Sequence, residues 1–420
     1  MLVLQAARKP QRSRGRIGLA IAGGGPIGGM YELGALRALD EAIEGFDPTH
    51  LEVYVGVSSG SFIAAGLANG LSTAEMYRIF ITGDSHEVRF RPGMFLKPAV
   101  VEYARRAAGL PGVAWQWWRD LLGNPAGTPM GELFRRMGGL IPTGLFDNAG
   151  IEHFLQEVFT SHGRSNDFRQ LEHRLIVVAA DLDSGEAVRF GSSGWDDVPI
   201  SRAIQASAAL PGLYPPVDIR GRHFVDGALR RTMNASVVLD HGIDLMIGIN
   251  PLVPVNTGRA GQTRPNGPGK LSEAGLPAVL SQTFRMLLQS RMQVGLTKYA
   301  EKYPLVDQMV LEPDDDDGEM FFTNIFSYSS RKHLCENAFR RTLDDLRKRR
   351  ATLGPILERH GLRLRDQVLD APHSVADGLQ RPPRRTEATA RLHRTLDRLD
   401  RQLRTGAPAR KNKATSRAMV

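Results

Sequence analysis

The chain has 420 residues, with 54 lysines and arginines against 45 aspartates and glutamates, a formal net charge of +9. The excess lies at the ends, because residues 381–420 carry twelve basic and three acidic side chains and residues 1–16 carry five basic ones and no acidic one. Charge confined to tails indicates no nucleic-acid partner, and a single cysteine excludes both an intramolecular disulfide framework and a cysteine-rich zinc site.

Strand and helix alternate in the predicted elements of the first eighty residues. Apolar runs at 17–22 and 51–57 predict buried strands that end in glycines or small residues. Apolar side chains recur at helical spacing over 27–43, and a helix of small residues follows the second strand. Ser72 and Glu75 form a capping box for the next helix. This alternation predicts a parallel sheet with helices on its faces.

The later chain is predicted to continue the sheet and then to become mostly helical. Its predicted strands lie at 174–182, 187–190, 222–226 and 244–249, and a short helix runs from Pro199 to Ala209. We divide the chain into a basic arm at 1–16, a catalytic domain at 17–254 with an insertion at about 85–150, a mostly helical extension at 255–380 and a basic tail at 381–420. Three tryptophans of the insertion, Trp115, Trp117 and Trp118, suit either a membrane-facing lid or buried packing.

A first chemical signal is the pentapeptide Gly56-Val57-Ser58-Ser59-Gly60, which fits G-x-S-x-G. It stands directly after a predicted strand and before a helix. A sharp turn at such a place lifts a serine Oγ above the sheet edge, and flanking glycines avoid clashes with the neighbouring elements. Ser58 is therefore the candidate nucleophile.

A glycine-rich loop, Gly23-Gly24-Gly25-Pro26-Ile27-Gly28, follows the first predicted strand. It fits the dinucleotide pattern G-x-G-x-x-G, but that function also needs an acidic residue at the end of the next strand. The next strand ends at the candidate nucleophile instead. The same amides, which point from a loop toward a helix N-terminus, suit a developing oxyanion, with Gly24 and Gly25 as the better donors.

A third signal is Asp226-Gly227-Ala228 at the end of a predicted short strand. An aspartate there is able to accept the serine proton, provided that it lies within hydrogen-bond reach of the hydroxyl. An isolated Asp-Gly more often forms a turn, so this signal depends on the other two.

Together these motifs resemble the patatin-like phospholipases, a family of lipid acyl hydrolases. The resemblance covers roughly residues 17–254 and extends to the segments AIAGGGPIGGMYELGALRAL, GVSSGSFIAAGLANG, VVAADLDSGE, AIQASAALPGLYPPV and FVDGALRRTMNAS. It implies a three-layer α/β/α fold with a mainly parallel sheet, followed here by a helical C-terminal extension. It also implies hydrolysis of phospholipid or other lipid esters through an acyl-enzyme, with no cofactor and no metal.

By the same resemblance, residues of this chain take family roles. Ser58 and Asp226 are implied as a catalytic dyad without histidine, and Gly23, Gly24, Gly25 and Gly28 as the oxyanion hole. Gly56, Gly60, Gly227 and Ala228 are implied as supporting motif residues. One departure is Ile27, which stands where the family usually has arginine or lysine.

Three other functions remain open on the sequence alone. An α/β-hydrolase would use a histidine after the acid in the chain, and His241, His333, His360 and His373 are available. A catalytically silent lipid-binding or membrane scaffold protein would bind lipid without turnover. An acyltransferase would use the same site with an alcohol in place of water.

The tail at 381–420 returns as a leucine-striped pattern with arginines on either side. The stripe consists of Leu392, Leu396, Leu399 and Leu403. A basic amphipathic helix of this kind is able to lie on an anionic membrane, pair as a short coiled coil, or dock on the body. With no signal peptide and no apolar run near the roughly 18 residues of a spanning helix, we expect a cytoplasmic protein with peripheral membrane contact through the tail.

Overall fold

The computed structural model describes residues 1–8, 15–85, 92–100, 142–257, 270–315, 328–371 and 374–380, together with isolated positions between these ranges. The chain divides into two compact units, Met1–Gly378 and Leu379–Val420. The predicted amphipathic helix of the tail lies outside the described residues, as do Trp117 and Trp118. Trp115 is described and is exposed.

One nine-stranded sheet organises the unit Met1–Gly378. Its strands are β1 (Leu2–Gln5), β2 (Ile17–Ile21), β4 (Val53–Val57), β5 (Arg174–Asp181), β6 (Ala187–Phe190), β7 (Val217–Ile219), β8 (Arg222–Asp226), β9 (Leu245–Ile249) and β10 (Asp307–Leu311). They lie in the order β1-β10-β9-β2-β4-β5-β8-β7, and β6 also pairs with β5. The neighbours from β10 to β5 are parallel, and the other pairings are antiparallel. A separate two-stranded sheet joins β3 (Ile43–Glu44) to β11 (Arg363–Leu364).

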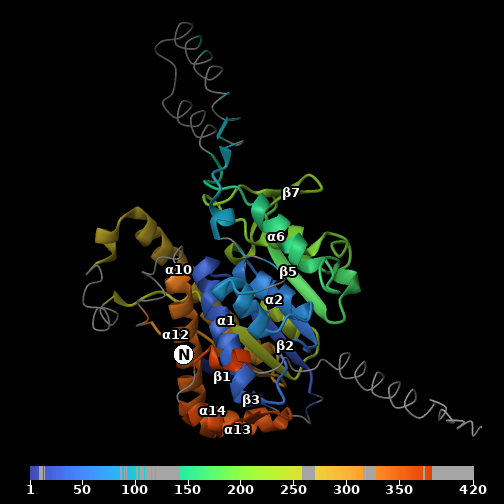
Figure 1. The fold of residues 1–420 in the computed structure, drawn as a ribbon, viewed down its shortest axis with the longest axis vertical. Coiled ribbons are helices and arrows are strands. Elements are labelled where there is room, and N and C mark those ends of the chain that lie inside the picture. Colours follow the sequence, from blue (N-terminus) through green and yellow to red (C-terminus); the bar gives the residue numbers. More distant parts are fainter. Residues whose placement is uncertain are drawn as a thin grey trace, which may run out of the picture. The chain divides into compact units, whose positions relative to one another are not determined.

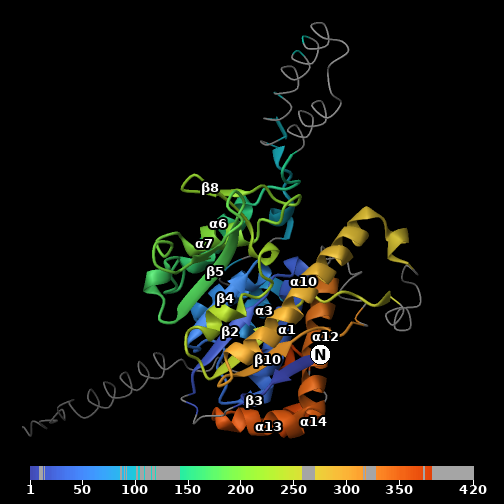
Figure 2. The ribbon, with the colours of Figure 1, turned by 180° about the vertical axis from the view of Figure 1, so that it is seen from behind.

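Helices cover both faces of the large sheet. Those described are α1 (Gly25–Ala42), α2 (Ser59–Ala68), α3 (Thr73–Tyr77), α6 (Ala149–Phe159), α7 (Ile200–Ser207), α8 (Ala235–Leu239), α10 (Leu276–Lys302), α12 (Tyr328–Lys348), α13 (Arg350–Arg359) and α14 (Asp366–Asp370). On one face α1 packs along α12 and beside α2 (Figure 1), and on the other face lie α8 and α10 (Figure 2). This arrangement confirms the predicted three-layer α/β/α fold. None of the described helices is long and apolar enough to cross a membrane.

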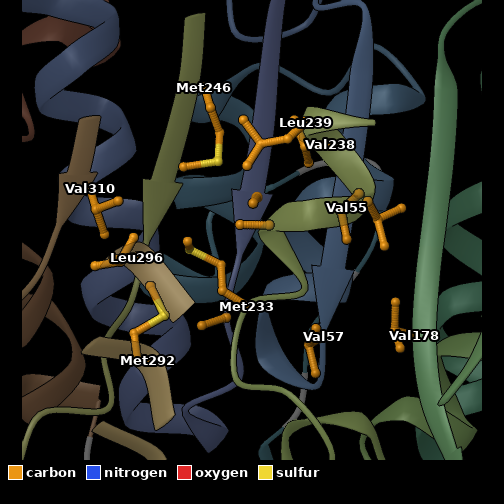
Figure 3. Packing of buried hydrophobic residues seen from close by; sticks show 14 of the residues in the cluster. Val55, Val57, Val178, Met233, Val238, Leu239, Met246, Met292, Leu296 and Val310 are labelled. Carbon is orange, nitrogen blue, oxygen red and sulfur yellow. The ribbon is translucent and has the colours of Figure 1, made fainter. Parts of the chain in front are cut away.

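The core explains why the central strands are apolar throughout. Every residue of β2 and β4 is buried, because parallel strands at the centre of such a sheet are covered on both faces. On one face, Val55 and Val57 of β4 belong to a single buried cluster with Val238 of α8 and with Met292 and Leu296 of α10 (Figure 3). The sheet edge that carries the candidate site therefore rests on a rigid, fully packed layer.

Three strands were not predicted from the sequence. β1 lies in the predicted basic arm, β10 in the region predicted to be mostly helical, and β7 is only three residues long. β1 and β10 pair with each other although about 300 residues separate them along the chain. Strands this short carry too few alternations for a periodic signal, so their formation depends on a partner that the local sequence does not reveal.

Candidate active site

Ser58 occupies the turn between β4 and α2. Its φ of 49° and ψ of −122° are unusual for a residue with a side chain, which marks a strained strand-to-helix turn. Two hydrogen bonds stabilise the turn: the Ser58 N–H donates to Ser207 Oγ at 2.9 Å, and the Ser61 N–H donates to the Ser58 carbonyl at 3.0 Å. The turn therefore presents the Ser58 hydroxyl at the carboxyl edge of the sheet.

The sheet register brings Asp226 to the same edge. Asp226 ends β8 and pairs with Ala179 of β5, while Val178, one residue earlier, pairs with the last residue of β4. Directly after Asp226 the chain passes close over β5, and a Cβ added at Gly227 would lie 2.2 Å from the Val178 carbonyl oxygen. Because no side chain fits there, glycine is required for the aspartate to reach the nucleophile.

The Ser58 hydroxyl and the Asp226 carboxylate are hydrogen-bonded to each other, and the two residues are only 5% and 4% exposed. Burial raises the pKa of Asp226 to about 6, although hydrogen bonds from the Ser58 hydroxyl and from the Ala228 N–H at 2.9 Å oppose that rise. A carboxylate with this pKa is a stronger base than an ordinary aspartate and is still mostly ionised at pH 7. The pair is therefore suited to general-base activation of the serine.

The glycine loop lies directly against Ser58. A Cβ added at Gly23 would lie 2.7 Å from Ser58 Cβ and 3.5 Å from Ser58 Oγ. Gly24 caps α1 and Gly25 is its first residue, so their amides have no acceptor inside the helix. Since α1 and α2 both begin at this point, two helix N-termini add positive potential beside the nucleophile.

The remaining motif residues pack closely around this centre. A Cβ at Gly56 would lie 2.4 Å from Ser61 Cα, and one at Gly60 would lie 2.5 Å from the Ala22 carbonyl oxygen. Gly28 is buried, whereas Ile27 is only partly buried and supplies no charge to the loop. Stabilisation of an oxyanion here would therefore come from amides and helix ends alone.

Two further polar residues support the nucleophile and were not singled out by the motifs. Ser207 of α7 is fully buried, accepts the Ser58 N–H and donates to the Val178 carbonyl oxygen at 2.6 Å. Glu32 of α1 is also fully buried, and its Oε1 accepts a hydrogen bond from Ser59 Oγ at 2.8 Å. Burial raises the pKa of Glu32 well above its usual range. The sequence analysis had noted the segment that contains Ser207 without giving this serine a role.

Replacing Ser207 by alanine is expected to destabilise the fold and to slow the reaction. The change leaves the Ser58 N–H and the Val178 carbonyl without their buried partner, which costs about 1–3 kcal/mol of unfolding free energy. Urea denaturation measures that loss, and kcat for an ester substrate measures the effect on the nucleophile. Ser201→Ala, on the same helix, is the matched control. Unchanged stability together with unchanged kcat would show that Ser207 does not position Ser58.

Histidines that would support an α/β-hydrolase lie elsewhere in the fold. His360 hydrogen-bonds through Nε2 to Asp307 at 2.8 Å and through Nδ1 to Ser13 at 2.8 Å. Asp307 is the first residue of β10, so this cluster lies at the amino edge of the sheet, opposite the edge that carries Ser58. His241 contacts the Val237 carbonyl, and His373 lies outside the described residues.

Within the described part of the chain, no group of three or more histidine, cysteine, aspartate or glutamate side chains is arranged to hold a metal ion. The fold and the site thus define an α/β protein with a serine at a strand–helix turn, an adjacent aspartate and a glycine loop. The chain belongs to the patatin-like phospholipase family, whose model matches residues 19–239, just over half of the chain.

Relatives of known name are distant and longer. An uncharacterized protein of Acanthamoeba polyphaga mimivirus is 24% identical over 235 residues, which are 55% of this chain and 64% of that protein. Lysophospholipase NTE1 of Phaeosphaeria nodorum is 25% identical over 234 residues, which are 56% of this chain but 12% of that protein. The chain thus spans less than two thirds of the length of either relative.

Solved structures give weaker matches. VipD from Legionella pneumophila shares 17% identity and a TM-score of 0.31, over 62% of this chain and 55% of that one. Full-length ExoU from Pseudomonas aeruginosa shares 15% identity and a TM-score of 0.30, over 84% of this chain and 67% of that one. With TM-scores below 0.5, the family assignment rests on the family model and not on these superpositions.

Proposed function

We propose that the protein is a serine lipid acyl hydrolase of the phospholipase A or lysophospholipase type. The observation that carries the proposal is the hydrogen bond between buried Ser58 and buried Asp226, whose pKa is raised to about 6. The family and the lysophospholipase names of its relatives support a lipid ester as the substrate.

The reaction proceeds in two acyl-transfer steps. Asp226 accepts the hydroxyl proton while Ser58 Oγ attacks the ester carbonyl, and the amides of Gly24 and Gly25 donate to the oxyanion. When the intermediate collapses, the carbon–oxygen bond to the alcohol breaks and Asp226 returns the proton to that leaving oxygen. Water then attacks the acyl-enzyme, gives its proton to Asp226, and Ser58 is regenerated as the fatty acid leaves.

A covalent probe combined with a substrate panel tests this function. The wild-type protein is incubated with phospholipid, lysophospholipid and a soluble short-chain ester, and free fatty acid is measured. A fluorophosphonate probe, which reacts with activated serines, is expected to modify the peptide that contains Ser58, as read by mass spectrometry.

The alternatives give different results in the same assay. A silent scaffold would bind lipid, release no fatty acid and leave Ser58 unmodified. An acyltransferase would accept the probe but would place the acyl group on an added alcohol in preference to water. Modification of another serine with Ser58 untouched would contradict the proposed nucleophile.

A further inference from the structure

Helix α10 exposes a row of large apolar side chains. Four of them, Leu276, Leu280, Leu287 and Val294, lie within about 40° of one another around the helix axis, at 3.6 residues per turn. Val279 and Met286 flank this row on one side. We call these six residues the α10 stripe; they are between 40% and 69% exposed. The stripe extends about 27 Å along the helix.

The stripe is distinct from the face by which α10 joins the core. Leu288, Met292 and Leu296 are buried on the opposite side of the helix and belong to the cluster beneath the sheet. Arg285, on this same inner side, is buried and donates to the Val253 carbonyl oxygen at 3.2 Å. α10 is therefore apolar on two opposite faces, and the fold accounts for only one of them.

The N-terminal half of α10 lies at the edge of the sheet that carries the active site. α10 connects the parallel neighbours β9 and β10, so it begins at the carboxyl edge, where Ser58 follows β4. The Arg291 guanidinium donates to the Leu229 carbonyl at 3.1 Å, three residues after Asp226. Both views show the first turns of α10 projecting beyond the sheet (Figures 1 and 2).

A second contact ties α10 to the oxyanion loop. Gln289 hydrogen-bonds to Asn250 at 3.2 Å, and the next residue, Pro251, packs so closely on the loop that a Cβ at Gly24 would lie 2.5 Å from it. The helix that bears the stripe is thus connected to both sides of the candidate site.

The charge of α10 selects among possible occupants. Residues 276–300 contain Arg285, Arg291 and Lys298 and no acidic residue. Arg291 and Lys298 are exposed on the same side as the stripe. An apolar face with cations beside it matches a bilayer surface with anionic headgroups. A second copy of α10, or the tail at 381–420 with its excess of basic residues, would bring like charges together.

We propose that the α10 stripe is a docking surface for anionic lipid bilayers, which places the active-site edge against the membrane. The proposal rests on the proposed function for its purpose, since it brings the catalytic serine to a lipid ester. It is independent of the tail, because the stripe belongs to the folded unit that contains the site.

Vesicle sedimentation of the full chain tests the docking surface without any catalytic turnover. The vesicles contain phosphatidylcholine and phosphatidylglycerol in equal parts. The Leu280→Asn/Leu287→Asn variant is expected to bind at least about tenfold more weakly, since two exposed leucines no longer leave water. The control variant, Ser281→Asn/Gln293→Asn, changes exposed positions of the same helix off the stripe and is expected to bind like the wild type.

Activity measurements separate docking from chemistry. The stripe variant is expected to lose hydrolysis of vesicle phospholipid by a similar factor while kcat/KM for a soluble short-chain ester stays within about twofold. Wild-type binding by the stripe variant would overturn the proposal, and so would a change from dimer to monomer without loss of vesicle binding. If no ester is hydrolysed but binding still depends on the stripe, the proposed function fails and the docking surface stands.

Discussion

Replacing Ser58 by alanine is expected to lower hydrolysis of every ester substrate by at least about a thousandfold. The change removes the only atom that is positioned to form the acyl-enzyme, while the glycine amides and the helix ends remain. Catalysis left in the variant would therefore measure oxyanion stabilisation alone, which accounts for a small part of the rate. Because alanine fits the Ser58 turn as well as serine does, the melting temperature is expected to stay within a few degrees of the wild type.

A matched control guards against a general effect of serine removal. Ser192 follows β6 at the amino edge of the sheet, away from the site, and Ser192→Ala is expected to retain full activity. Parallel loss across phospholipid, lysophospholipid and short-chain ester would indicate one shared nucleophile. If short-chain ester activity survived in Ser58→Ala while phospholipid activity vanished, a second nucleophile would have to act on the soluble substrate, and the proposed mechanism would be incomplete.

The candidate site was predictable from the sequence because its parts are local. Each motif combines a buried strand with a turn that tolerates few residue types, so Gly56–Gly60 and Gly23–Gly28 carry their geometry in five or six consecutive positions. Asp226 was recognised through Gly227, whose missing side chain is what lets the chain pass over Val178. In these places the chemical requirement and the backbone requirement coincide.

The support around the site was not predictable in the same way. Ser207 and Glu32 sit within ordinary helical sequence, and their roles arise from contacts with residues 149 and 27 positions away along the chain. A buried serine or glutamate in a helix has no local signature that distinguishes it from an exposed one. The same holds for β1 and β10, which become strands only because each completes the sheet for the other. The outer face of α10 shows the converse: an apolar row that sequence periodicity detects but that the fold alone does not bury.

Replacing Asp226 by asparagine is expected to abolish activity and, at neutral pH, to stabilise the protein. Asparagine keeps the shape of the side chain but is not a base, so ester hydrolysis is expected to fall by at least about a thousandfold. In the wild type the pKa of this carboxyl rises from 3.8 to about 6 on folding, because burial disfavours the charged form. At pH 7 the folded protein therefore carries an ionised group that it would hold more easily as a neutral one.

The sign of the pH dependence follows from that shift. Between about pH 4 and pH 6 the folded state binds more protons than the unfolded state, so the contribution of Asp226 to stability decreases as pH rises through this window. Above it, ionised Asp226 costs up to about 3 kcal/mol, of which asparagine is expected to restore about 1–3 kcal/mol. Activity has the opposite trend, since the base must be ionised, and kcat/KM of the wild type is expected to rise with pH to a plateau with its midpoint near 6.

Urea denaturation at pH 5 and pH 7 measures the stability difference, and a pH series of kcat/KM measures the titration of the base. Asp183→Asn, which changes an exposed carboxylate in the turn after β5, is the control and is expected to alter neither. The two effects must appear together, because both follow from one buried charge. Loss of activity with loss of stability would mean that Asp226 serves to hold the turn at Gly227, and the serine would then require a different base.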